Sequence, residues 1–378
     1  MISDEQVGEA LRAAGLAAPV LRSIDPDVVR ARAARRRRAD IAAVAVGLLV
    51  VVALAVTATR GLLVAQPAPV TTPIPSRAAL PPIPDASAAS VDGRVLVTVT
   101  TVLAGSGAAA SRLAYVDSAG LHEIPLAAGL DPSGAVWATH DSVVFAAGPP
   151  GGAHLYTTRV DGTDARRLTS DAGSQDDPAV SRDGSTVVFV QRSEQGVNEG
   201  LRSLSLRDGR TESLTPAVGT AVLGAGDEHP TYSADGSQIA FVRVVDGNTT
   251  MSALWTVRSD GTGLRRLTPD ATATDHPRWS PDGTRILYSQ GRAYSTSSTP
   301  VWLVDVAGGP PRPVLRTADG SDVWDATWSP DGTHLASVRY PPGTTHNELR
   351  ITAADGTDAR TLWTGTDGLG VQSPDWTS

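Results

Sequence analysis

Short apolar runs recur between turn signals along residues 88–378, and residues 275–288 (DHPRWSPDGTRILY) are the clearest example. Runs rich in β-branched and aromatic residues that end at Gly, Pro or Asp predict β-strands. Here Trp279 lies on one strand, 280–283 form a tight turn, and 285–288 return as the next strand. Pro281 presets φ in that turn, and Gly283 supplies the positive φ of a bulged hairpin.

This pattern repeats at a nearly constant period. Its turn aspartates are Asp92, Asp141, Asp183, Asp235, Asp282 and Asp331. Their spacings of 42 to 52 residues match the period of a four-stranded propeller blade. A second hairpin signal, such as Asp161-Gly162 or Asp260-Gly261, follows within each unit. The sequence therefore predicts an all-β fold, a six-bladed β-propeller with four antiparallel strands per blade.

The two ends of the repeat region predict how the ring closes. Residues 372–377 match the start of a blade, whereas the first unit, at Ser90, lacks that strand. We expect 372–377 to pair with 94–100, so that both ends of the region build one blade and no sheet edge is left open.

These repeats resemble the PD40 (WD40-like) repeats of the TolB family over about residues 88–378. The resemblance implies a six-bladed propeller and protein–protein interaction in the cell envelope. The chain departs from periplasmic TolB because it shows a retained anchor with a cytoplasmic tail and no separate folded N-terminal domain. The partners of the periplasmic protein are therefore not carried over.

The N-terminal part predicts a membrane anchor. Residues 1–40 form a tail that ends in an arginine cluster, and Ile41 to Thr59 are uncharged and mostly apolar. Residues 41–60 are long enough for a transmembrane helix, and the arginines before them place the N-terminus in the cytoplasm. A Pro/Ala-rich linker, 61–87, then leads to an extracytoplasmic propeller, 88–378. The alternative interpretation is a cleaved signal peptide, but nearly forty residues precede the span, whereas a signal peptide has a shorter charged region.

Composition limits the chemistry. The chain has a net charge of −8 and no cysteine, which excludes thiolate metal sites and a cysteine nucleophile. Residues 41–378 hold 24 basic and 34 acidic residues, so their general field disfavours nucleic acid. We find no nucleophile-elbow, HExxH or P-loop motif. We therefore predict a protein that is not an enzyme and needs no cofactor.

The candidate ligand-binding residues precede the first strand of successive blades. Aligned on the following proline or its equivalent, they are Asp177, His229, His276 and Asp325. Because first strands line the channel of a propeller, we expect these side chains to converge at one mouth. Such a ring could bind a cation, a basic peptide or a polar small molecule. The alternative is that they only fix the loops between blades by hydrogen bonds. No metal-ligand set is assigned.

The sequence thus favours a membrane-anchored propeller that acts as a protein- or ligand-binding scaffold in the cell envelope, with an envelope protein or peptide as partner. A second hypothesis is an envelope sensor that signals to a cytoplasmic regulator, with an anti-sigma-type partner. A third is a metal-dependent propeller lyase or lactonase.

Overall fold

The computed structural model describes residues 82–85, 92–102, 109–149, 151–218, 225–244, 252–269, 274–290, 300–317, 319–344, 346–366 and 368–377. The predicted tail and transmembrane span, residues 1–60, lie outside these ranges. Within them, all regular structure is β, and we find no helix long and apolar enough to cross a membrane.

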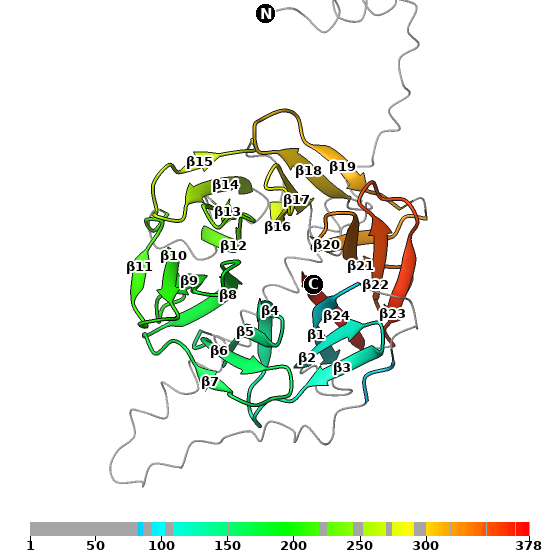
Figure 1. The fold of residues 1–378 in the computed structure, drawn as a ribbon, viewed down its shortest axis with the longest axis horizontal. Helices are drawn as coiled ribbons and strands as arrows, with labels where there is room; N and C mark the ends of the chain where they lie inside the picture. Colours follow the sequence, from blue (N-terminus) through cyan, green and yellow to red (C-terminus); the bar gives the residue numbers. More distant parts are fainter. Residues whose placement is uncertain are drawn as a thin grey trace, which may run out of the picture. The chain divides into compact units, whose positions relative to one another are not determined.

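The described strands form six four-stranded antiparallel sheets, which are arranged as blades around a central axis (Figure 1). The blades, each given from the axis outward, are as follows. Blade 1 has β24 (Leu369–Thr377), β1 (Arg94–Val102), β2 (Ala109–Asp117) and β3 (Gly120–Ile124); blade 2 has β4 (Pro132–Thr139), β5 (Ser142–Ala147), β6 (His154–Arg159) and β7 (Arg166–Arg167). Blade 3 has β8 (Ser174–Val180), β9 (Thr186–Arg192), β10 (Asn198–Ser205) and β11 (Thr211–Ser213); blade 4 has β12 (Gly226–Tyr232), β13 (Gln238–Val244), β14 (Ser252–Arg258) and β15 (Arg265–Arg266). Blade 5 has β16 (Thr274–Trp279), β17 (Arg285–Gln290), β18 (Val301–Asp305) and β19 (Arg312–Leu315); blade 6 has β20 (Asp322–Trp328), β21 (His334–Tyr340), β22 (Glu348–Ala353) and β23 (Arg360–Thr364). The predicted six blades of four strands are confirmed.

The Ser-Pro-Asp-Gly turns join the first and second strands of the blades, as predicted. In blade 5 the Ser280 hydroxyl donates to Asp282 at 2.5 Å, and the Thr284 N–H donates to the same carboxylate at 3.0 Å. Gly283 follows with φ +70°. The aspartate therefore satisfies donors on both sides of the turn, while the glycine supplies the left-handed conformation.

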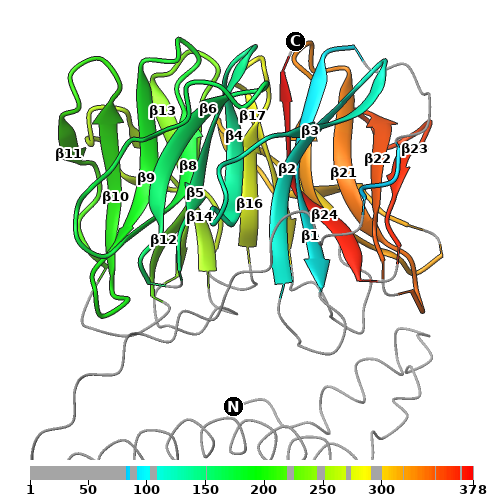
Figure 2. The ribbon, with the colours of Figure 1, turned by 90° about the horizontal axis from the view of Figure 1, so that it is seen from below.

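The predicted closure is also confirmed. β24 pairs antiparallel with β1, with Thr377 opposite Arg94 and Leu369 opposite Thr101. Figure 2 shows β24 and β1 side by side, although they lie at opposite ends of the described chain. Blade 1 is thus assembled from both ends, and the inner edge of β1 is covered.

The core lies between adjacent blades, where apolar residues of neighbouring sheets interleave. Between blades 3 and 4, for example, Val188 and Val190 pack with Ile239 and Phe241. The tryptophans that end first strands belong to these clusters: Trp137, Trp279 and Trp328 are buried, and Trp376 is partly buried. They pack between the blades and hold the innermost strands in place.

Candidate functional site

Each innermost strand contains one residue in the left-handed backbone region, at the same position in every blade. These residues are Gly134, Asp177, His229, His276, Asp325 and Ser373, with φ between 47° and 55°. Each lies where the pairing of its strand shifts register at a β-bulge. A left-handed conformation costs a non-glycine residue about 1–2 kcal/mol, and such strain concentrates at functional sites. The four predicted site residues all belong to this set, which we call the bulge ring.

The bulge re-aims these side chains, and four consecutive blades meet through them. His229 Nδ1 lies 3.4 Å from Asp177 Oδ2, and His276 Nε2 lies 3.8 Å from Asp325 Oδ2. The two imidazoles stack with their centroids 4.2 Å apart. The structure thus brings together all four residues that the sequence singled out.

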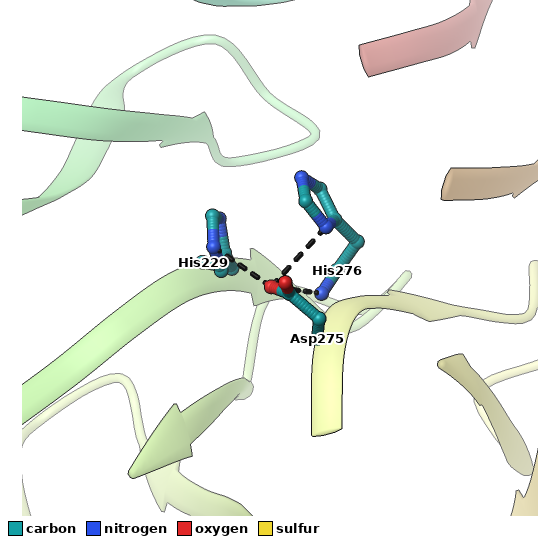
Figure 3. Close-up of side chains that lie close together, drawn as sticks. All are labelled: His229, Asp275 and His276. Carbon is teal, nitrogen blue, oxygen red and sulfur yellow. Dashed lines mark hydrogen bonds and ion pairs between the residues drawn. The ribbon is translucent and has the colours of Figure 1, made fainter. Parts of the chain in front are cut away.

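A fifth residue, Asp275, joins the two histidines (Figure 3). Its Oδ1 lies 2.8 Å from His229 Nε2 and 3.2 Å from His276 Nδ1. Asp275 was not among the predicted site residues, although the sequence contains a signal for it. Asp176, Glu228 and Asp275 each precede a bulge-ring residue, so an acidic side chain recurs at that position in three successive blades.

Backbone groups also take part in this network. The His229 N–H donates to Asp177 at 3.4 Å, and the Ser373 N–H donates to Asp325 at 2.6 Å. The Asp325 N–H in turn donates to the Ser289 hydroxyl at 3.0 Å. The bulge ring therefore does fix neighbouring blades to one another, as the alternative interpretation expected.

The electrostatics favour positive charge at His229. Burial works against a charged His229, but the carboxylates of Asp177 and Asp275 outweigh it and raise its pKa to about 10. Burial likewise opposes the charge on Asp275, yet His276 and His229 hold its pKa well below the usual range. Burial raises the pKa of Glu228 beside them. The neighbouring carboxylates therefore stabilise a positive charge on the His229 ring.

The bulge ring opens into a cavity of about 660 Å³ on the propeller axis. Asp177, His229, His276 and Ser373 line it, and Arg278 contributes a cation to its wall. Asp325 lies behind this wall at 1% exposure, with Arg278 Nη2 3.9 Å from its Oδ1. A small polar ligand or one side chain of a partner could reach the imidazoles through this cavity.

Neither a protein-family model nor a curated protein matches this chain by sequence. Solved structures match its fold. TolB from Acinetobacter baumannii is 17% identical with a TM-score of 0.58, over 75% of this chain and 66% of that one. The putative TolB from Agrobacterium tumefaciens is 18% identical with a TM-score of 0.54, over 75% of this chain and 93% of that one. At this identity the likeness shows a shared propeller fold alone.

The prediction that the chain is not an enzyme is wrong, because neither the missing motifs nor a propeller fold excludes catalysis. The matching structures include oligogalacturonate lyase in complex with manganese, a puromycin hydrolase and a gluconolactonase from Xanthomonas campestris. The lyase is 15% identical with a TM-score of 0.49, over 73% of this chain and 75% of that one. A fold does not determine a function, so the propeller leaves enzymatic activity open.

Proposed function

We propose that this chain is a membrane-anchored, TolB-like propeller of the cell envelope that binds a positively charged group of an envelope protein or peptide at its channel. The observation that carries the proposal is the bulge ring. Two carboxylates and two imidazoles meet there from strained backbone positions, and Asp275 adds a third carboxylate, beside a cavity that a ligand can enter.

The chemistry of the site supports a cationic ligand. Asp177 and Asp275 surround His229 and raise its pKa, which means that their field favours positive charge at that point. Asp177 is a quarter exposed and lines the cavity, so its carboxylate can meet an ammonium or guanidinium group directly. A buried or half-buried charged hydrogen bond of this kind contributes more than a neutral one.

A pair of peptides tests the binding step. We expect a lysine-rich peptide to bind the full-length chain in low salt and its glutamate-rich counterpart to bind weakly. Asp177→Asn should weaken the lysine-rich peptide at least tenfold, because asparagine tolerates the left-handed backbone but lacks the charge. Equal binding of both peptides, or an unchanged affinity in Asp177→Asn, would contradict the proposal.

The envelope location rests on the sequence of residues 30–60 and has its own test. A reporter that is active only outside the cytoplasm, fused after Ser378, should be active, and the full-length chain should stay in the membrane fraction. Six arginines lie within residues 30–38, directly before the apolar residues 41–59, which favours a cytoplasmic N-terminus. A mature form beginning near Ala65 would show instead that the span is a cleaved signal.

A further inference from the structure

The geometry points to a divalent transition-metal site formed by His229, Asp275 and His276, open to the channel cavity. This inference rests on the proposed function, because it uses the same carboxylates that would bind a positively charged ligand in the channel. Its three ligand atoms come from β12 and β16 of adjacent blades and all lie within 4.8 Å of one another.

The spacing of the three atoms is close to what a metal needs. One carboxylate oxygen, Asp275 Oδ1, lies 2.8 Å from His229 Nε2 and 3.2 Å from His276 Nδ1. Ligand bonds of about 2.0–2.2 Å in tetrahedral geometry place ligand atoms about 3.3–3.5 Å apart. Small side-chain movements would therefore admit an ion among them.

One of these contacts is not a hydrogen bond. Within the described residues, His276 Nδ1 is buried and has no hydrogen-bond partner, although it lies close to the Asp275 carboxylate. A buried ring nitrogen without a partner costs free energy, typically about 1–3 kcal/mol. A metal ion between this nitrogen and the Asp275 oxygen would satisfy both atoms, so the missing hydrogen bond supports a ligand at this point.

The groups behind the ligands fit the same assignment. Metal-binding histidines usually present their second ring nitrogen to a carboxylate, which fixes the tautomer and orients the ring. Here both histidines do so, since His229 Nδ1 faces Asp177 and His276 Nε2 faces Asp325. Asp325 is 1% exposed, and its Oδ1 has no hydrogen-bond partner among the described residues. A metal on His276 Nδ1 would hold the proton on Nε2, directed toward this carboxylate.

The ligand set defines the class of ion. Two imidazoles and one carboxylate suit zinc, iron, manganese and related ions, whereas calcium and magnesium prefer oxygen ligands. His229 and His276 line the cavity, so a fourth position would face it. An open position is the feature that separates catalytic from structural zinc sites, and there a water molecule or a ligand oxygen could bind.

Metal titration of the full-length, untagged, chelator-treated chain tests the site. We expect one Zn²⁺ or Co²⁺ per chain by calorimetry, a higher melting temperature with the metal, and little response to Mg²⁺. Asp275→Asn and His276→Asn should abolish this binding. Asp177→Asn changes the carboxylate that faces His229 and should weaken metal binding about 10–100-fold. This variant keeps the inference testable if a ligand variant folds poorly.

A matched control lies elsewhere on the propeller. His122 Nε2 also contacts an aspartate, Asp117, at 3.0 Å, but no third ligand joins them among the described residues. His122→Asn should therefore bind the metal like the unaltered chain. Zinc binding that survives His276→Asn, or that His122→Asn removes, would overturn the assignment.

The outcomes separate this inference from the proposed function. If no metal binds but the lysine-rich peptide still does, the metal assignment fails and the cationic-ligand proposal stands. If neither binds, both fail. If Zn²⁺ binds and displaces the peptide, the two share the carboxylates of the bulge ring and both are supported.

Discussion

At the scale of single residues, aspartate has two different structural roles in this propeller. In the exposed turns it accepts hydrogen bonds from the chain itself, as Asp235 does from the Ser233 hydroxyl and the Ser237 N–H. In the bulge ring it faces imidazoles and is partly or fully buried. The same type of side chain stabilises a turn where its neighbours are hydroxyl and backbone donors. It gives the cavity negative charge where its neighbours are imidazoles.

The turn aspartates predict how stability responds to acid. Hydrogen bonds from Ser181, Ser233 and Ser329 lower the pKa of Asp183, Asp235 and Asp331, respectively, from 3.8 to about 2. A lowered folded pKa gives stability that is present above pH of about 4 and is lost as pH falls toward 2. We expect the melting temperature of the full chain to fall over this window.

The triple variant Asp183→Asn/Asp235→Asn/Asp331→Asn isolates this contribution. It should be less stable than the parent at pH 7, because asparagine accepts these hydrogen bonds without charge, and the difference should shrink toward pH 2. Thermal melts across pH 2–7 measure both effects. A difference that stays constant over this range would show that the turn carboxylates do not control the acid response.

At the scale of elements, the innermost strand of each blade carries both the bulge and the site, so whatever fixes that strand fixes the site. β12 shows how this is done. Asp227 is fully buried two residues before His229, and the Arg243 guanidinium of β13 binds it with two contacts of 2.6 and 2.8 Å. The Thr215 hydroxyl donates to the same carboxylate at 2.6 Å. The Arg243 guanidinium also stacks on the Trp255 ring, 5.1 Å from its centroid.

Removing one partner of this pair should be costly. Arg243→Ala leaves Asp227 buried without its charge partner, and such losses typically cost about 3–5 kcal/mol. The control is Arg243→Met together with Asp227→Leu, which removes both charges and should recover much of that loss. Chemical denaturation of both variants measures the difference. A cost below about 1 kcal/mol for Arg243→Ala would show that water or a rearranged side chain replaces the guanidinium.

The sequence predicted the position of the site residues but not the contacts between their side chains. Turn chemistry and period place Asp177, His229, His276 and Asp325 at equivalent positions of their repeats. They were predicted to precede the first strands, but they lie inside these strands, because pairing resumes on both sides of the β-bulge. The left-handed backbone of Asp177, His229 and His276 could not be predicted from the sequence, since each precedes a proline and such residues ordinarily favour extended conformations. Asp275 was missed because only the bulge turns its carboxylate toward a histidine of the neighbouring blade.

At the scale of the whole molecule, a single strand closes the six described sheets into one ring. β24 pairs along β1 and also reaches blade 2, where the Trp137 N–H donates to Asp375 at 2.8 Å. The Trp137 indole donates to the Asp375 carbonyl at 3.2 Å. On its other side Ser373 contacts Asp325 of blade 6. β24 therefore holds three blades together and completes the bulge ring.

Deleting residues 371–378 tests this closure. The deletion uncovers the inner edge of β1, removes buried Val371, and leaves the Trp137 N–H without its partner. Loss of one large buried side chain alone commonly costs about 2–5 kcal/mol, and a domain has about 5–15 kcal/mol in total. We expect residues 1–370 to be insoluble or to lose their cooperative thermal transition, since an open edge also promotes aggregation.

Trp376→Phe in the full-length chain separates closure from local packing. Trp376 is only partly buried, and its indole donates to the Asp92 carbonyl at 2.9 Å. Phenylalanine keeps most of the packing and all of the strand pairing, so this variant should unfold cooperatively with a modest loss of stability. If residues 1–370 instead melt at the same temperature as the full chain, β24 contributes little, and the ring is held by the interfaces between the other five blades.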